Sequence, residues 1–297
     1  MNWFILSLIA ILFWSGSDLF SKMGSQPDDR LSHWKMVIAV GFVMGTHAII
    51  QLVSGAEFYL YDIITYLPAS FLYILSMIFG YMGLRYIELS LSSPICNSSG
   101  AVAAVLCFIF LKESMNSLQF LAVGLITLAV FLLSYIEKKN DRRLMLQEGI
   151  VPDKKHTRSV LAIVLPILYC IIDGLGTFAD AVLLNGHITE ERGNIAYELT
   201  FLAMGISAFI YVVVIKKDRL TVKHDGYKLV GALCETAGQF AYIYAIGAKA
   251  ILAAPLISSY CIASLLWSRL ILKERLTKKQ YAVIFMAAVG IVILGME

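Results

Sequence analysis

Hydrophobic stretches of about 20 residues recur along this chain, and they restrict its possible folds more than any other feature. Each stretch is long enough to cross roughly 30 Å of hydrocarbon. The 297 residues are 59% hydrophobic and 15% charged, with a mean hydropathy of +0.77, whereas about 25% of the residues in an average domain are charged. Because helices satisfy their own backbone hydrogen bonds in lipid, the sequence predicts an all-α, multi-pass protein of the cell membrane, in contact with the lipid bilayer.

The hydrophobic pattern predicts ten transmembrane helices. They are expected at 2–22, 34–54, 61–84, 89–111, 117–136, 159–184, 195–215, 227–247, 250–272 and 278–296. The connections between them are short except for the polar, basic loop 137–158. This loop divides the chain into one five-helix repeat at 1–136 and a second at 159–297.

The two halves can be aligned without gaps. Residues 90–119 lie over 251–280 at a constant offset of 161. The aligned identities include Pro94 with Pro255, Ser98 with Ser259, Leu111-Lys112-Glu113 with Leu272-Lys273-Glu274, and Gln119 with Gln280. A repeat with an odd number of spans must cross the membrane in the opposite direction in its second copy, and inverted repeats of this kind are common in secondary transporters.

The opening segment LFWSGSDLFSK (12–22) also matches LYCIIDGLGTF (168–178) in form. Together with the repeated proline and Leu-Lys-Glu unit, it resembles the drug/metabolite transporter superfamily, in its EamA-type branch of ten-helix permeases. The resemblance implies two inverted five-helix repeats around a central cavity lined mainly by helices 1, 3, 4, 6, 8 and 9. It also implies alternating-access transport without ATP. The superfamily moves amino acids, nucleotide sugars, amines and drugs, so the substrate stays open.

Other functional classes find little support in the sequence. No Walker loop, HExxH or GxSxG motif occurs, and the short loops leave no space for a catalytic domain, so no enzyme activity, catalytic residue or cofactor is expected. The five cysteines lie in apolar segments without a CxxC pair, which indicates packing residues rather than a metal site. The expected partners are a small solute and lipid, not nucleic acid, and the expected state is a monomer or homodimer.

The basic residues are distributed unevenly between the two membrane faces. Of the 24 lysines and arginines, 21 flank one side, and the other side has only Lys112, Arg192 and Lys249. Positive charge marks the cytoplasmic side, so this bias predicts that both termini lie outside and loop 137–158 inside. The family resemblance implies the reverse orientation.

Five acidic residues fall inside the predicted spans: Asp18, Asp173, Asp180, Glu198 and Glu235. An ionised side chain near the bilayer centre costs about 2.5–3.5 kcal/mol on insertion scales, and such residues usually face a cavity or a partner. Structural alternatives stay open for three of them. Asp18 can pair with Lys22 four residues later, Asp180 can be interfacial, and Glu198 can extend toward the membrane surface.

Helical spacing places carboxylates beside aromatic rings. Trp14 shares a face with Asp18, Tyr169 with Asp173 and Asp180, and Glu235 with Gln239 and Tyr242. Gly174 and Gly176 remove side-chain bulk next to Asp173, which permits close helix approach or space for a ligand. The complete set of predicted solute-binding residues is Trp14, Asp18, Tyr73, Asn97, Tyr169, Asp173, Asp180, Glu235, Gln239, Tyr242 and Ser259.

A cavity with carboxylates and aromatic walls suits an organic cation such as a quaternary ammonium or an amine. Proton coupling is compatible with this hypothesis. The alternative is an exporter of amino acids or other neutral or zwitterionic metabolites. In that case the carboxylates would carry coupling protons, because burial favours the protonated form of an acid. His47 is interpreted as a packed polar residue rather than a proton relay.

Overall fold

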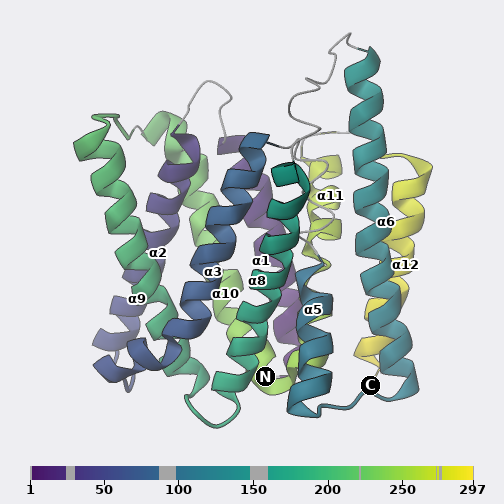
Figure 1. Cartoon of the computed structure of the whole chain (residues 1–297), viewed down its shortest axis with the longest axis horizontal. Helices are drawn as coiled ribbons and strands as arrows, with labels where there is room; N and C mark the ends of the chain where they lie inside the picture. Colours follow the sequence, from purple (N-terminus) through teal and green to yellow (C-terminus); the bar gives the residue numbers. More distant parts are fainter. Residues whose placement is uncertain are drawn as a thin grey trace. The chain divides into compact units, whose positions relative to one another are not determined.

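The structure, a computed structural model, describes residues 2–24, 31–86, 98–147, 160–220, 222–271, 273 and 276–296. These residues form ten α-helices and two short π-helical segments (Figure 1). The elements are α1 (Trp3–Gly24), α2 (Ser32–Val53), α3 (Leu60–Tyr86), α5 (Ser99–Leu106), η1 (Cys107–Leu111), α6 (Ser117–Gln147), α8 (Val160–Leu184), α9 (Glu190–Phe209), η2 (Ile210–Ile215), α10 (Val222–Ile257), α11 (Tyr260–Leu270) and α12 (Lys278–Gly295). Seven helices among the described residues are long and apolar enough to cross a membrane.

The predicted span at 250–272 is wrong as a single helix. α10 contains a non-helical residue, Lys249 (φ −164°, ψ 77°), and continues to Ile257, and α11 begins only at Tyr260. Pro255 cannot donate a helical backbone hydrogen bond, and the hydroxyl of Ser259 donates to the carbonyl of Leu256 (2.6 Å) where the helix stops. The hydrophobic run is thus interrupted at Ser258 and Ser259, three residues after Pro255.

The predicted loop 137–158 also begins too early. α6 continues past residue 136 to Gln147, and residues 148–158 lie outside the described part. The segment EKKNDRRLMLQ is rich in glutamate, lysine, arginine, leucine and glutamine, which have high helix propensity. A helix of such composition is stable beyond the membrane surface, where hydropathy no longer signals it.

Contacts divide the chain into two compact units. Unit 1 comprises Met1–Ser70, Asp180–Ala248 and Ala263–Leu272, and unit 2 comprises Phe71–Ala179, Lys249–Ile262 and Lys273–Glu297. Each unit therefore takes residues from both halves of the sequence. The divisions fall inside α3, α8 and α11 and at the non-helical Lys249.

In unit 1, α2 and α9 lie side by side (Figure 1). Their backbones touch at Gly41 and Gly205, where a Cβ on Gly41 would lie 2.6 Å from the carbonyl oxygen of Phe201 and 2.7 Å from the Cα of Gly205. Small residues permit this approach in membranes, where helix association depends on packing and hydrogen bonds.

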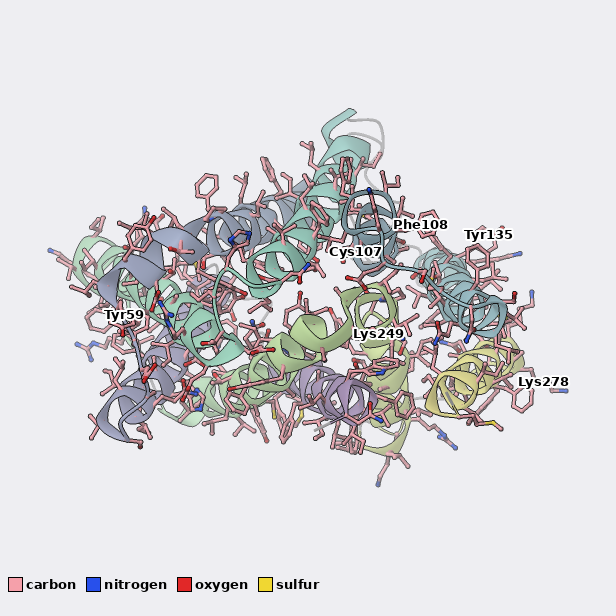
Figure 2. The ribbon with its side chains drawn as sticks, turned by 90° about the horizontal axis from the view of Figure 1, so that it is seen from below. Tyr59, Cys107, Phe108, Tyr135, Lys249 and Lys278 are labelled. Carbon is pink, nitrogen blue, oxygen red and sulfur yellow. The ribbon has the colours of Figure 1, made fainter. Side chains whose placement is uncertain are left out.

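In unit 2, α6 and α12 lie side by side (Figure 1). Gly290 of α12 packs on Ile126, because a Cβ there would lie 2.8 Å from that side chain. In η1, Cys107 is buried and Phe108 is 57% exposed (Figure 2). Tyr135 of α6 is 64% exposed. Large exposed apolar side chains on membrane helices are expected to contact lipid, so these positions mark part of the outer surface of unit 2.

Candidate functional site

In unit 1, α1 and α10 pack antiparallel through small residues. A Cβ on Gly238 would lie 2.4 Å from Cδ1 of Trp14, and one on Gly16 would lie 3.5 Å from Sγ of Cys234. Closer to the end of α1, a Cβ on Gly231 would lie 3.2 Å from Oγ of Ser21. Later residues of α1 therefore meet earlier residues of α10. This register brings the predicted Trp14 and Asp18 face beside the predicted Glu235, Gln239 and Tyr242 face.

Asp18 and Glu235 form a cluster of two carboxylates on these helices. Asp18 is exposed, and the hydroxyl of Ser264 on α11 donates to its Oδ2 (2.9 Å). Glu235 is half-buried and lies beside the hydroxyl of Ser17, within electrostatic range of Asp18. The described partners of both carboxylates are neutral hydroxyls. The predicted alternative of an Asp18–Lys22 pair concerns a lysine side chain outside the described residues.

Asp180 of α8 has a different environment. It is fully buried and accepts hydrogen bonds from the hydroxyls of Tyr66 (2.5 Å) and Tyr242 (3.1 Å). The ring of Tyr242 in turn lies against that of Trp14, with 5.0 Å between centroids. Asp180 is therefore inaccessible, and its carboxylate holds two tyrosines in place.

Gln239 is 3% exposed, and its Nε2 has no hydrogen-bond partner among the described residues. It lies one helical turn from Glu235 on α10. A buried donor without a partner is costly, so this amide is suited to a ligand or a water molecule.

In unit 2, Asp173 lies where α3, α5 and α8 meet. It is half-buried, accepts a hydrogen bond from Ser76 (3.2 Å) and lies beside the hydroxyl of Ser99. The glycine after it permits the approach of α5, because a Cβ on Gly174 would lie 2.9 Å from the carbonyl oxygen of Ser99. Of the two predicted roles for this glycine, the structure supports close helix approach.

The other predicted residues of unit 2 are less accessible or have structural contacts. The hydroxyls of Tyr73 and Thr177 form a hydrogen bond (3.0 Å), and the ring of Tyr73 packs over Gly176. Tyr169 is half-buried. Ser259 is 2% exposed, and its hydroxyl is used at the break after Leu256. Asn97 lies outside the described residues.

Comparison with known proteins gives the family. The model of the EamA-like transporter family matches residues 1–135 and 160–296. This chain belongs to the EamA-like transporter family. No curated protein sequence matches it. A solved crystal structure of another protein aligns with 99% of this chain and 96% of its own, with a TM-score of 0.72 and 12% identity, which shows likeness of fold alone.

The family establishes the general function. This EamA protein is a multi-pass membrane protein and a secondary transporter of a small solute, and it is not an enzyme. The two family matches also confirm the predicted pair of repeats. The resemblance seen in the repeated Leu-Lys-Glu unit is therefore confirmed at the level of the family.

Sequence reasoning missed several partners of the EamA transporter's carboxylates. Tyr66, Ser76 and Ser264 all bind an acidic side chain that is distant in sequence. Serine and tyrosine are common in membrane helices, so their identity alone gave no signal. Only the helix register shows which of them face a carboxylate.

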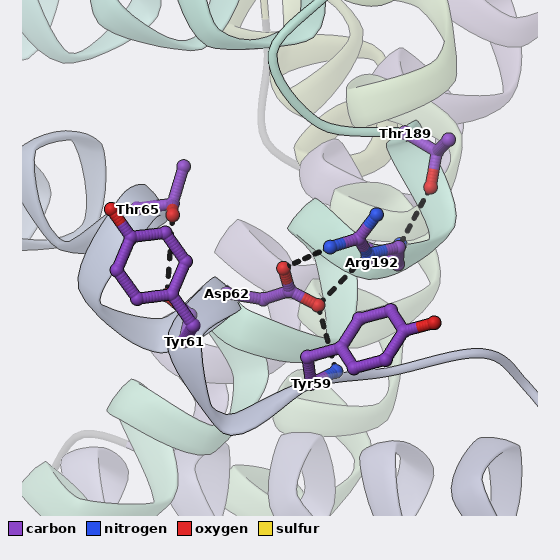
Figure 3. A network of polar contacts seen from close by, with 6 residues as sticks. All are labelled: Tyr59, Tyr61, Asp62, Thr65, Thr189 and Arg192. Carbon is purple, nitrogen blue, oxygen red and sulfur yellow. Dashed lines mark hydrogen bonds and ion pairs between the residues drawn. The ribbon is translucent and has the colours of Figure 1, made fainter.

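An ion pair at the first turns of α3 and α9 was also missed (Figure 3). Arg192 binds Asp62 through two nitrogens, with Nε donating to Oδ2 at 2.8 Å and Nη2 donating to Oδ1. The guanidinium also lies 4.9 Å from the ring centroid of Tyr59. The hydroxyl of Thr189 accepts from the backbone nitrogen of Arg192 and caps α9. Bidentate pairs of this kind fix geometry, so Arg192 joins two chain segments of unit 1.

Proposed function

We propose that this transporter carries a small organic cation by alternating access and that Asp18 and Glu235 bind it. The proposal rests on a difference in accessibility and in hydrogen-bond partners among the carboxylates of unit 1. Asp18 and Glu235 remain accessible and have serine partners. Asp180 and Glu198 are 0% exposed and have dedicated partners from other helices.

Accessible charge inside a membrane span needs water or a counter-charge. Ionised groups exposed to hydrocarbon are expensive, and they usually line hydrated pathways. A serine hydroxyl orients a carboxylate but does not neutralise it. Two neighbouring carboxylates with hydroxyl partners thus provide a negative field that a cationic solute would complement.

Aromatic rings on the same helices fit this solute. Trp14 lies one helical turn from Asp18 and stacks near Tyr242 of α10. Tryptophan binds cations over its face most strongly among the aromatic residues. We propose that Trp14 contributes to binding, with Gln239 as a hydrogen-bond donor, while Tyr242 positions the tryptophan ring.

Asp173 in unit 2 is proposed as a further solute contact. It keeps partial exposure and has serine partners, as Asp18 and Glu235 do. Tyr169 precedes it by one turn on α8 and completes the pairing of a carboxylate with a ring. The proposal gives Asp173 a contribution separate from the Asp18 and Glu235 cluster.

The test uses two solutes of nearly equal shape and different charge. A ligand that binds the folded protein raises its melting temperature by mass action. We expect choline to raise it and the neutral isostere 3,3-dimethylbutan-1-ol to leave it unchanged. Stabilisation by alanine, with none by choline, would instead favour the neutral or zwitterionic substrates of the alternative hypothesis.

We also propose that both termini face the extracytoplasmic side. Twenty-one of the 24 basic residues flank the opposite side. Of the three exceptions, Arg192 is paired with Asp62, which compensates its charge. Lysine and arginine in short loops direct insertion, and this distribution supports the proposed orientation.

A further inference from the structure

We infer that His47 of α2 and Glu198 of α9 form an exchangeable proton site that couples transport to a pH gradient. The cluster comprises His47, Gln51, Asn194 and Glu198. The inference rests on the transporter function and not on the identity of the solute. It assigns a role to two groups that the proposed cation site does not use.

The core of the cluster is a short contact between two titratable groups. Nδ1 of His47 lies 2.7 Å from Oε1 and 3.0 Å from Oε2 of Glu198. A carboxylate only accepts, so Nδ1 carries the hydrogen. The second ring nitrogen, Nε2, is therefore the atom that gains or loses the exchangeable proton.

The two partners differ in accessibility. The side chain of Glu198 is 0% exposed, whereas that of His47 is 33% exposed. Water can reach the imidazole but not the carboxylate. A buried negative charge next to an accessible base favours proton capture from solution, because the proton converts a lone buried charge into an ion pair.

Gln51 can bind both forms of the imidazole. Its Nε2 lies 3.4 Å from Nε2 of His47, while its Oε1 is buried and has no hydrogen-bond partner among the described residues. The amide nitrogen donates to a neutral imidazole. If the ring is protonated, the rotated amide offers Oε1 as an acceptor. The two amide orientations thus match the two protonation states.

Asn194 provides an independent sign of a polar site. It is 0% exposed, and its side chain interacts with the carboxylate of Glu198 on α9, although neither of its polar atoms has full hydrogen-bond geometry with a described residue. Buried polar atoms without partners are rare, and an unseen water is one common explanation. Such a water would hydrate the carboxylate of Glu198 when the proton leaves.

Among the described residues, the charged group that acts on each member of the pair is the other member. From α10, the neutral ring of Phe240 meets the imidazole edge-on, with 5.5 Å between centroids. The close packing of α2 on α9 holds the two groups together.

The position along the helices gives a path for protons. His47 precedes Val53, the last residue of α2, by six residues, and Gln51 lies between them. At about 1.5 Å per residue, the imidazole lies about 9 Å from that helix end. The step is a proton transfer: Nε2 takes a proton from water at this end, an N–H bond forms, and the cluster gains one positive charge. Release to water in the other transport state reverses it.

The direct test counts protons. Purified protein in weak buffer is moved from about pH 8.5 to about pH 5.5, and an indicator dye reports proton uptake. The variants are Glu198→Gln, His47→Asn, whose amide nitrogen can still donate to Glu198, and the double variant. We expect His47→Asn and the double variant to take up about one proton fewer than the wild type, and Glu198→Gln to take up its proton at a lower pH, because its imidazole has lost the carboxylate beside it.

Two results would overturn the inference. Equal proton uptake by the wild type and His47→Asn would show that the imidazole exchanges no proton between these pH values. Loss of the proton in His47→Asn with an unchanged uptake midpoint in Glu198→Gln would show an ordinary histidine that titrates without Glu198. Gel filtration identifies a variant that fails to fold. The proton uptake of the other single variant then tests the inference.

Coupling is measured in liposomes with labelled choline as the probe. We expect His47→Asn to lose the extra accumulation that a pH gradient produces and to keep choline exchange at equal pH. Gradient-driven accumulation at the wild-type level would contradict coupling through this cluster. If the wild type moves no choline, the proposed cation substrate fails, and the proton count still decides the role of the cluster.

Discussion

Lys112 and Lys273, which occupy equivalent places in the two halves of the chain, both adopt a left-handed backbone conformation, with φ of 54° and 57°. This conformation ends a helix, and it is unfavourable for residues with a Cβ. Lys112 directly follows η1 and ends it, and Lys273 takes the same conformation three residues after the end of α11 at Leu270. The sequence alignment located this unit but gave no reason for it.

Replacement of Lys112 by glycine should stabilise the protein. Glycine adopts the left-handed conformation without strain, and we expect a gain of about 0.5–1 kcal/mol in the free energy of unfolding. Unfolding by SDS titration measures it. The control is Lys139→Gly inside α6, which should lose about 1 kcal/mol, because glycine is unfavourable in a helix interior. Destabilisation by Lys112→Gly would show that its side chain has a role of its own.

Glu113, the third residue of the Leu-Lys-Glu unit, caps a helix segment of α10. Its Oε2 accepts a hydrogen bond from the backbone nitrogen of Ile251 (3.2 Å), just after the non-helical Lys249. Loss of a helix cap costs about 1 kcal/mol. We expect Glu113→Ala to lower stability by about this amount and Glu113→Gln, which retains an acceptor, to lower it less. Equal losses in both variants would mean that the charge, not the cap, matters.

The tyrosines around Asp180 should be structural. Tyr66→Phe removes a donor from a fully buried carboxylate, and we expect a loss of about 1–3 kcal/mol. The exposed Tyr135→Phe is the matched control and should leave stability unchanged. Thermal unfolding of the purified variants measures both. Wild-type stability in Tyr66→Phe, with lost solute binding, would instead place Asp180 in the binding site.

The fold was largely predictable, because hydrophobic length and the basic loops report directly on membrane crossing. The non-helical Lys249 and the interruption after Ile257 were not, since hydropathy does not respond to backbone geometry. The extension of α6 to Gln147 was missed for a related reason. A polar sequence of good helix formers resembles a loop when only hydropathy is considered.

Part of the proposed site follows from helical spacing. Spacing put Trp14 and Asp18 on one helix face and Glu235 and Tyr242 on another, and the register of α1 and α10 places these faces side by side. Spacing within one helix says nothing about partners on other helices. For this reason the sequence did not separate the accessible Asp18 from the tyrosine-bound Asp180, and it did not pair His47 with Glu198.

The orientation of the chain can be measured with a C-terminal fusion. The excess of lysine and arginine on one side predicts that a reporter active only in the cytoplasm stays dark at Glu297. A reporter active only outside the cytoplasm should give a signal at the same position, which controls for expression. The opposite pair of signals would show that the orientation implied by the family overrides the charge bias.

The most direct test of the cation site is the affinity of choline for the wild type and for Asp18→Asn and Glu235→Gln, measured by thermal shift or calorimetry. Each amide retains the shape of the acid but loses its charge, and the control is Asp218→Asn, which alters an ion pair between the exposed Asp218 and the buried Lys35, away from the proposed site. We expect each site variant to lose about 1–3 kcal/mol of binding, or roughly 5- to 150-fold in Kd, and the control to bind as the wild type does. Equal choline affinity in the wild type and both site variants would contradict the proposed site.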